Sequence, residues 1–234
     1  GSSLTGSYNL IKGNEFQNGS KGVFLSGTSG FSKQFTIDSN SFTGTYQYDI
    51  YVANIDNVDI TKNKIERKGL QSTSAYGIYS GNANGVYNIN NNTIAINNIG
   101  TTTYGIYANA NQSSVDSLSS ISNNTVTATS DNNGTIYGLY FNASTYANVK
   151  NNAVAINTSS TVSYGVYATG SVGGLNFYNN SVQNASPSTS NTSAAAYFSK
   201  TTAVNGVLNI RNNIFSHSGG NRAYQVVNQN FIYS

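Results

Sequence analysis

The residues of this chain that are best placed to contact a ligand are tyrosines. The sequence contains 18 Tyr and 10 Phe among 234 residues. A Tyr closes the same short motif, typically Gly-aliphatic-Tyr, about once every 28 residues. Six members of this column are the candidate ligand-binding residues: Tyr51, Tyr79, Tyr107, Tyr140, Tyr167 and Tyr197. Phe24 and Tyr224 continue the column at its two ends. Tyrosine combines a flat apolar face with a polar tip, so a stripe of tyrosines bordered by Asn, Ser and Thr could hold sugar rings.

A polysaccharide or cell-surface glycan is therefore the expected partner of the tyrosine column. The more economical interpretation is that the rings stack on their equivalents in neighbouring repeats and only stabilise the fold. The residue two positions before each Tyr is often Gly, as in Gly77, Gly105 and Gly138. We expect this position to face outward as well, which would leave a groove beside the rings. A further set of tyrosines has the opposite parity and is expected to face inward: Tyr48, Tyr76, Tyr104, Tyr137 and Tyr164.

Carboxylates that could catalyse a reaction or bind a metal cluster only once along the chain. Of the eight Asp and Glu residues, four form the group Asp38, Asp49, Asp56 and Asp59. Glycoside hydrolysis needs two carboxyl groups at a suitable separation, and Ca²⁺ needs several carboxylate oxygens. Asp49 replaces the motif Gly two residues before Tyr51, so we expect it in the outward groove. The alternative function is thus a polysaccharide lyase or hydrolase with a site near Asp49, Asp56 and Asp59.

Other features favour a non-catalytic protein, although they leave catalysis open. The only histidine, His217, is far along the chain from the acidic group. The basic run Lys62, Lys64, Arg67 and Lys68 is expected to form a solvated loop. The chain has no Cys, which excludes disulfides, Cys-ligated zinc and thiol catalysis. We therefore expect no catalytic residues, no metal site and no cofactor.

Charge and hydropathy exclude further classes of function. Charged residues make up only 8% of the chain and the net charge is +3, whereas a nucleic-acid binder would carry dense Lys and Arg on one face. No apolar run approaches the roughly 20 residues that span a bilayer. We therefore expect no nucleic-acid partner and no membrane span.

An asparagine motif alternates with the tyrosine motif along the whole chain. It reads apolar-x-x-Asn-x-apolar and occurs eight times, with 23 to 33 residues between successive Asn. The eight residues are Asn14, Asn40, Asn63, Asn92, Asn124, Asn152, Asn180 and Asn213. Asn tolerates left-handed backbone conformations, and stacked amides can bond from repeat to repeat. We interpret this column as architectural, placed at a bend between two strands.

These elements imply an all-β solenoid. Each half of the repeat alternates with period two, is rich in β-branched and aromatic residues, and is too short for a helix. Eight coils of about 28 residues, with strands about 4.8 Å apart, would form a rod roughly 38 Å long. The position before each motif Tyr is aliphatic, as in Ile50, Ile78 and Ile106, and is expected to point into the core.

The repeated G-[IVL]-Y followed by I-x-N-N-x-[IV] resembles the right-handed parallel β-helix repeats of the pectin-lyase-like superfamily and the carbohydrate-binding and sugar-hydrolase repeats related to it. More narrowly, it resembles Asn- and Tyr-rich repeats of secreted bacterial surface proteins. The resemblance covers essentially the whole chain and implies a fold more firmly than an activity, because these proteins include lyases, hydrolases and adhesin stalks. The Asp pair followed by Gly-His that is typical of polygalacturonases is absent.

We therefore predict one domain over residues 1–234, a right-handed parallel β-helix of about eight coils. The expected location is extracellular or at the surface of a bacterium. The expected role is a non-catalytic stalk or adhesin segment that contacts polysaccharide through its tyrosines. We also expect a segment of a longer protein with flanking domains, and residues Gly1–Ser3 look like a cloning remnant.

Overall fold

A computed structural model of the protein describes residues 8–27, 34–68, 74–83, 85–97, 101–130, 134–170, 172–189, 191–199, 206–219 and 222–227. These residues form strands, turns and bends, and no helix. Within them there is accordingly no helix of the length and apolarity that a membrane crossing requires. Residues Gly1–Ser3, interpreted above as a cloning remnant, lie outside the described part.

The strands belong to three parallel sheets, each of eight strands, and every coil contributes one strand to each sheet. Sheet A contains β1 (Asn9–Lys12), β4 (Phe35–Asp38), β7 (Val58–Thr61), β10 (Tyr87–Asn90), β13 (Ser119–Ser122), β16 (Thr145–Lys150), β19 (Gly173–Tyr178) and β22 (Asn209–Arg211). Sheet B contains β2 (Glu15–Gln17), β5 (Ser41–Thr43), β8 (Lys64–Lys68), β11 (Thr93–Asn97), β14 (Thr125–Ser130), β17 (Ala153–Thr158), β20 (Ser181–Asn184) and β23 (Ile214–His217). Sheet C contains β3 (Lys21–Ser26), β6 (Tyr48–Ala53), β9 (Ala75–Gly81), β12 (Thr103–Asn109), β15 (Ile136–Asn142), β18 (Ser163–Thr169), β21 (Ser193–Ser199) and β24 (Tyr224–Val227).

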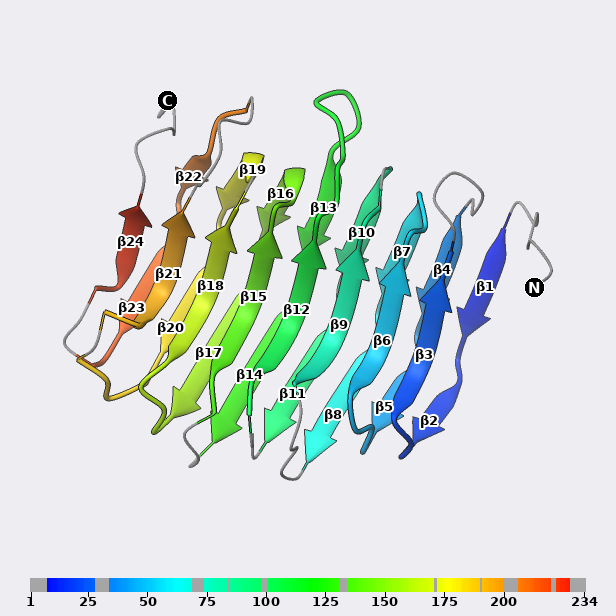
Figure 1. Ribbon diagram of the computed structural model, residues 1–234, viewed down its shortest axis with the longest axis horizontal. Coiled ribbons are helices and arrows are strands. Elements are labelled where there is room, and N and C mark those ends of the chain that lie inside the picture. The colour runs from blue at the N-terminus through cyan, green and yellow to red at the C-terminus, as the bar shows by residue number, and fades with distance from the viewer. Residues whose placement is uncertain are drawn as a thin grey trace.

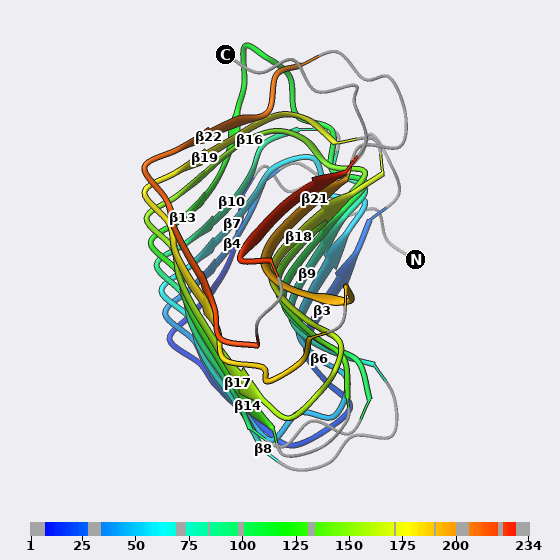
Figure 2. The same cartoon turned by 90° about the vertical axis from the view of Figure 1, so that its left-hand side faces the viewer.

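The chain winds through the three sheets in the same order in every coil, so the protein is a parallel β-helix. Figure 1 shows the strands stacked side by side from β1 at one end to β24 at the other. Figure 2 looks along the axis from the C-terminal end, where the chain passes from sheet A to B to C counterclockwise as it approaches the viewer. This winding is right-handed, as the repeats predict.

The core is built from columns of aliphatic and aromatic side chains that stack from coil to coil. The expected facing of the aliphatic positions is confirmed, because the residues of these columns in coils two to seven are no more than 2% exposed. In sheet A they are Ile37, Ile60, Ile89, Ile121, Val149 and Phe177; in sheet B Phe42, Ile65, Ile94, Val126, Val154 and Val182; in sheet C Ile50, Ile78, Ile106, Leu139, Val166 and Ala196. Equivalent side chains meet because parallel pairing keeps each one directly above its counterpart, as for Ile106 above Ile78.

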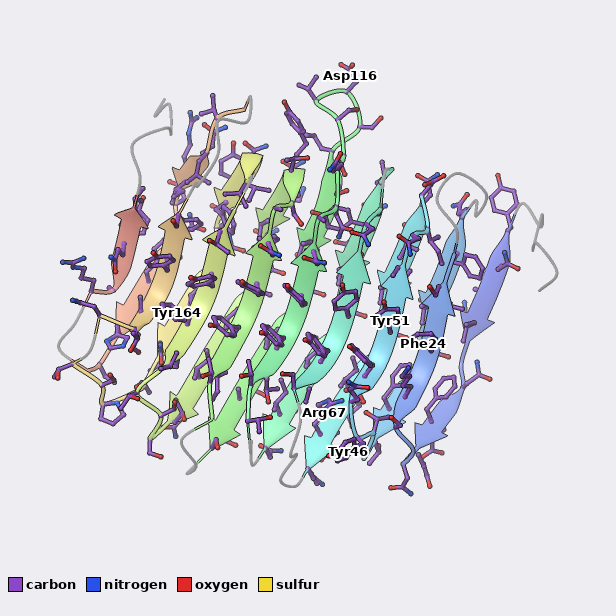
Figure 3. The ribbon with its side chains drawn as sticks, viewed as in Figure 1. Phe24, Tyr46, Tyr51, Arg67, Asp116 and Tyr164 are labelled. Carbon is purple, nitrogen blue, oxygen red and sulfur yellow. The ribbon has the colours of Figure 1, made fainter. Side chains whose placement is uncertain are left out.

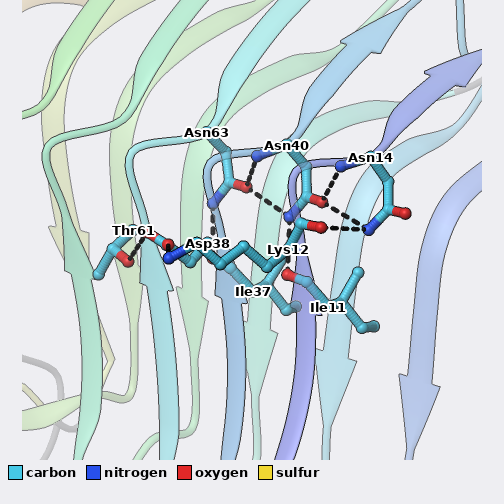
Figure 4. Close-up of polar contacts among 8 residues, drawn as sticks. All are labelled: Ile11, Lys12, Asn14, Ile37, Asp38, Asn40, Thr61 and Asn63. Carbon is cyan, nitrogen blue, oxygen red and sulfur yellow. Dashed lines mark hydrogen bonds and ion pairs between the residues drawn. The ribbon is translucent and has the colours of Figure 1, made fainter.

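The asparagine column forms a continuous ladder at the bend between sheets A and B, as expected. Each Nδ2 donates to the Oδ1 of the next ladder Asn at 2.8–3.1 Å. Each backbone N–H donates to the same oxygen at 2.9–3.1 Å. Figure 4 shows the first three residues of the ladder, where Asn40 Nδ2 also donates to the Ile11 carbonyl at 2.9 Å. The ladder therefore satisfies backbone groups that the bend removes from the sheets.

The left-handed residue of this bend is the one before the ladder Asn. In all eight coils its φ lies between +54° and +67°. The position holds Gly13, Ser39, Lys62, Asn91, Asn123, Asn151, Asn179 and Asn212. The two residues of each Asn-Asn pair therefore have different roles. The first Asn adopts the positive φ that the bend requires, and the second Asn forms the hydrogen bonds of the ladder.

Candidate functional site: a tyrosine face on sheet C

The strands of sheet C carry two rows of aromatic side chains on their outer surface. The first row contains Tyr48, Tyr76, Tyr104, Tyr137 and Tyr164. The second contains Phe24, Tyr51, Tyr79, Tyr107, Tyr140, Tyr167 and Tyr197. We call the two rows together the tyrosine face, and Figure 3 shows its rings running across the strands between Phe24 and Tyr164. The second row was expected outside, whereas the expectation that the first row faces inward is wrong.

A bulge explains why both rows lie on one face. Along β12, Tyr104 and Tyr107 are half-buried on the outside, and the two residues between them, Gly105 and Ile106, both point inward. The pairing register of sheet C skips this Gly position in each pair of neighbouring strands from β3 to β21. One extra residue in a strand reverses the parity of the residues after it, so residues three apart come to share a face.

The expected outward groove at the glycine positions is therefore also wrong. A Cβ on Gly105 would lie 2.6 Å from the Cγ1 of Val126, which belongs to the opposite sheet B, and 2.5 Å from the Gly138 carbonyl oxygen. Glycine is needed here because the backbone of sheet C approaches the core of sheet B closely.

Within the first row the rings lie face to face. Their centroids are 4.7–5.6 Å apart and successive planes agree within 12°. The second row is interrupted: Tyr51 and Tyr79 are stacked at 9°, but Tyr79 and Tyr107 meet at 73°. Stacked faces are occupied by neighbouring rings, so a ligand of this surface meets ring edges and hydroxyl groups. The expectation of open ring faces thus needs correction, while the outward position of the six candidate tyrosines agrees with the sequence.

Two amides border the tyrosine face where the second row changes orientation. Asn109 Nδ2 donates to the Tyr79 hydroxyl at 3.0 Å, and the Tyr107 hydroxyl lies 3.4 Å from Asn109 Oδ1. Asn142 Nδ2 donates to the same Oδ1 at 2.8 Å. The turned ring of Tyr107 and these amides create a polar strip beside the rings.

The tyrosine face is almost free of charge. In β6, β9, β12, β15, β18 and β21 the only charged residue is Asp49, which is buried. At the N-terminal end the Lys21 ammonium lies 3.8 Å from the centroid of the Phe24 ring, a cation–π contact. Burial, with neighbouring tyrosines as a further cause, raises the pKa of Tyr76, Tyr104 and Tyr140. Their hydroxyls are consequently protonated at neutral pH and able to donate hydrogen bonds.

The second row ends at Tyr197, since Tyr224 does not continue it. Gln225 pairs with Tyr197, and Tyr224 pairs with Ala196. The Tyr224 ring stacks on Phe215 at 5.7 Å and 6°. The pairing of β24 with β21 is displaced by one residue from the expected register. Tyr224, and not Ala223, therefore pairs with Ala196 of the aliphatic column.

The acidic group does not assemble into a site. Asp49 is fully buried, and Arg67 of β8, only 3% exposed, forms an ion pair with it inside the solenoid. The Thr45 hydroxyl donates to Asp49 as well. Burial raises the pKa of Asp49, while Arg67 and Thr45 oppose this shift. Asp49 was expected in an outward groove beside Tyr51, so that prediction is wrong, as is the expectation that Arg67 belongs to a solvated loop.

The other carboxylates lie elsewhere. Asp59 is on the outer surface of sheet A, where it accepts a hydrogen bond from Asn88 Nδ2 at 2.8 Å. Asp38, on the same sheet, pairs with Lys12 at 3.0 Å, which is the main cause of its lowered pKa. Asp56 is half-buried in the connection between β6 and β7. No substrate could reach Asp49 and Asp59 together, because one faces the interior and the other faces solvent.

His217 is not free at the surface but bonded near the last coils. Its Nδ1 accepts from the Gly219 N–H at 3.1 Å, so the neutral ring carries its proton on Nε2. That Nε2 lies 2.8 Å from the hydroxyl of Ser193, to which it donates. This tautomer cannot accept a proton from Ser193 through Nε2, so the pair does not have the arrangement of a nucleophile and its base.

Comparison with known proteins supports the fold. Residues 1–116 match the family model described as periplasmic copper-binding protein (NosD). No curated protein matches the chain, and no solved structure matches it. Together with the winding of the strands, the family match identifies the chain as a parallel β-helix repeat protein, and the resemblance to the pectin-lyase-like superfamily agrees with this.

The residues of this chain do not fit copper. Copper sites use Cys and Met sulfur and His imidazole. The chain has no Cys and no Met, and its single His lies outside the matched residues. In the described ranges there is also no group of three or more His, Cys, Asp and Glu residues that could hold a metal ion. Copper binding is therefore a description of the matched family, and we do not assign it to this chain.

Proposed function

We propose that this protein is a non-catalytic β-helix module of the bacterial cell envelope or exterior, and that its tyrosine face contacts a neutral polysaccharide. The observation that carries the proposal is a row of aromatic side chains over seven coils of one sheet, accompanied by a second row of tyrosines over five of them, on strands that expose almost no charge. Ten of its eleven tyrosines are half-buried, so part of each ring remains accessible. The family match to a periplasmic protein supports the location.

The chemistry of the tyrosine face suits a neutral glycan better than a charged one. Protonated phenol groups donate and accept hydrogen bonds, as sugar hydroxyls do, and ring edges supply apolar contact between them. The amides of Asn109 and Asn142 extend the polar border. An anionic polymer would meet no cation on the sheet C strands β6, β9, β12, β15, β18 and β21, so uronic acid chains are disfavoured.

The extent of the rows favours a polymer aligned with the solenoid axis. Six steps of about 4.8 Å separate the first coil from the seventh, which gives a surface about 29 Å long. From Tyr51 to Tyr197 each coil repeats the same phenol group, so a chain molecule could make many weak contacts of one kind. Multiple weak contacts raise the overall affinity through avidity.

The test is polysaccharide binding by variants that keep the ring stacks. Replacing Tyr79, Tyr107, Tyr140 and Tyr167 with Phe removes four hydroxyls and preserves the rings. We expect this variant to bind neutral polysaccharides such as starch or β-glucan at least tenfold more weakly in affinity electrophoresis. Tyr107→Ala/Tyr140→Ala should lose binding altogether, and Tyr8→Phe, far from the face, should bind like the parent.

Either of two results would refute the proposal. One is that no neutral polysaccharide retards the parent protein. The other is that the four-Phe and double-Ala variants, with melting temperatures showing that they are folded, bind like the parent. The tyrosine face would then be a stabilising ladder in a spacer module, a role that its self-stacked rings already support.

A further inference from the structure

A second candidate site lies on sheet A, away from the tyrosine face. It is a groove of about 390 Å³ at the outer surface of the later coils. Its walls and base include Val115, Leu118, Tyr146, Asn176, Val207 and Asn209. The volume falls within the range of small-molecule sites in proteins. These side chains come from successive coils, so the groove follows the solenoid axis.

One wall is a loop that projects from the solenoid between β12 and β13. Figure 3 shows Asp116 at its tip, well away from the body of the rod. Val115 of this loop is 68% exposed. The base of the loop is firmly held, since Gln112 N–H donates to the Ala83 carbonyl at 2.7 Å and Thr145 N–H to the Asn111 carbonyl at 2.9 Å. A loop anchored to the coils on both sides can present an apolar side chain to solvent in a fixed position.

Another part of the lining is a tyrosine in an unfavourable backbone conformation. Tyr146 has a φ of +52°, which is unusual for a bulky residue. Its ring packs over Gly174, where a Cβ would lie 2.3 Å from the Cδ1 of Tyr146. A Cβ on Gly206, one coil further, would lie 2.4 Å from the Gly174 nitrogen. Gly174 thus makes room for the ring, and Gly206 lets the next coil approach the backbone of Gly174 closely.

Two carboxamides supply the polar part of the groove. Asn209 Nδ2 donates to Asn176 Oδ1 at 2.7 Å, and Asn176 Nδ2 donates to Asn148 Oδ1 at 2.9 Å. These bonds hold the amides in a defined orientation along the outer surface of sheet A. No lining side chain in the described part of the groove is charged.

We propose that this groove binds a neutral saccharide of one or two sugar rings. An aromatic ring and aliphatic side chains match the C–H faces of a sugar, and oriented carboxamides match its hydroxyls. The lack of charge in the lining argues against phosphorylated or carboxylated sugars. The groove is independent of the tyrosine face, so either site can bind ligand without the other.

The test is saturation-transfer difference NMR on the intact protein. The probes are D-glucose, N-acetyl-D-glucosamine, maltose and cellobiose, with D-glucuronate as the charged comparison. Tyr146→Asn removes the ring while keeping a residue that tolerates positive φ. Leu118→Ser/Val207→Ser alters the apolar walls from two different elements. Tyr8→Asn is the matched control, because Tyr8 is 79% exposed in the first coil.

We expect saturation transfer to at least one neutral probe, with an affinity at least tenfold lower in Tyr146→Asn and in Leu118→Ser/Val207→Ser. The Tyr8→Asn protein and the four-Phe variant of the tyrosine face should bind the probe like the parent, which separates this groove from that face. The proposal is overturned if no neutral probe receives saturation, if D-glucuronate binds as well, or if both groove variants bind unchanged. Because two variants alter different elements, a folding failure of one still leaves the other as a test.

Discussion

Arg67 of β8 and Asp49 of β6 form an ion pair in the interior of the solenoid, 3% and 0% exposed respectively. Each replaces the usual residue of its column. Asp49 stands where the next four coils have Gly77, Gly105, Gly138 and Gly165, and Arg67 pairs in register with Ile96. The pair therefore joins the second coil to the third across the core, between sheets C and B. Because two charges can only be buried together, we infer that it also fixes the register of these two coils.

The first prediction concerns the ion pair. Asp49→Asn leaves the Arg67 guanidinium buried without a counter-charge, and we expect the free energy of unfolding to fall by about 3–5 kcal/mol. Replacing both partners by the residues of other coils, Asp49→Gly/Arg67→Ile, should be close to neutral or stabilising. Urea unfolding followed by circular dichroism gives both values. If Asp49→Asn has the same free energy of unfolding as the parent, the ion pair does not contribute to stability in the way that its burial implies.

A second prediction tests the core column of sheet C. Ile106 is 1% exposed and packs in register between Ile78 and Leu139. Ile106→Asp would bury a charge without a partner, so we expect a loss of more than about 4 kcal/mol. Hydrogen exchange should show lost protection in β9, β12 and β15 first, because each coil contacts mainly its neighbours.

The matched control for this change is Thr125→Asp, which places the same side chain on the outer surface of sheet B. It should unfold within about 1 kcal/mol of the parent, as surface substitutions usually do. Equal melting temperatures for Ile106→Asp and the parent would contradict the inward facing of Ile106.

Much of the fold could be predicted from the sequence because each structural position of a solenoid recurs in every coil, so equivalent residues recur along the sequence. Eight Asn at similar spacing predict the ladder, because stacked side-chain amides can bond from coil to coil when every coil has Asn at the same position. The aliphatic residue before each Tyr predicts the core in the same way. A single short strand is ambiguous in sequence, but eight repeats with the same pattern support the same assignment.

The candidate site was predicted less well, because its facing depends on a bulge. Strict alternation places Tyr104 and Tyr107 on opposite faces, yet both lie outside. The signal was the Gly between them, which marks a bulge when it recurs inside a strand. The alternation of inward and outward residues could also have predicted that Arg67 points inward, because it lies two residues after the inward Ile65 on β8. Nothing in the sequence placed Tyr146 and Val115 in the same groove, because the position of Val115 depends on the path of a long loop.

A third prediction concerns the asparagine ladder. Asn124 Oδ1 accepts from the N–H and the Nδ2 of Asn92, each at 3.0 Å, and its Nδ2 donates to the Ile89 carbonyl at 2.7 Å. Asn124→Ala would leave these buried groups unpaired, and we expect a loss of about 3 kcal/mol.

Asn14→Ala is the control within the same ladder. Asn14 is exposed, and its side chain donates to Asn40, whereas no described residue donates to its Oδ1. Its replacement should cost less than about 1 kcal/mol. Comparable losses for the two variants would show that the ladder bonds do not determine the stability of the bend.

The last prediction concerns alkaline pH. Burial, together with neighbouring tyrosines, raises the pKa of Tyr76, Tyr104, Tyr140 and Tyr164 above the ordinary value. In the unfolded chain these groups lose their protons near pH 10. The folded state then holds protons that the unfolded state has lost, so stability falls as pH rises. We expect a constant urea midpoint from pH 7 to about 9 and a steady decline above about pH 10, with tyrosinate absorbance at 295 nm appearing together with unfolding.

Lysine also titrates in this range, so the contribution of tyrosine needs a variant. Replacing Tyr76, Tyr104, Tyr140 and Tyr164 with Phe keeps the stacked rings and removes four titrating groups. The decline above about pH 10 should become shallower in this variant, while Tyr8→Phe should follow the parent. If these tyrosines ionise near pH 10 in the folded protein without loss of stability, the tyrosine face is more open to water than its burial indicates, and its ring faces would then be accessible to a ligand.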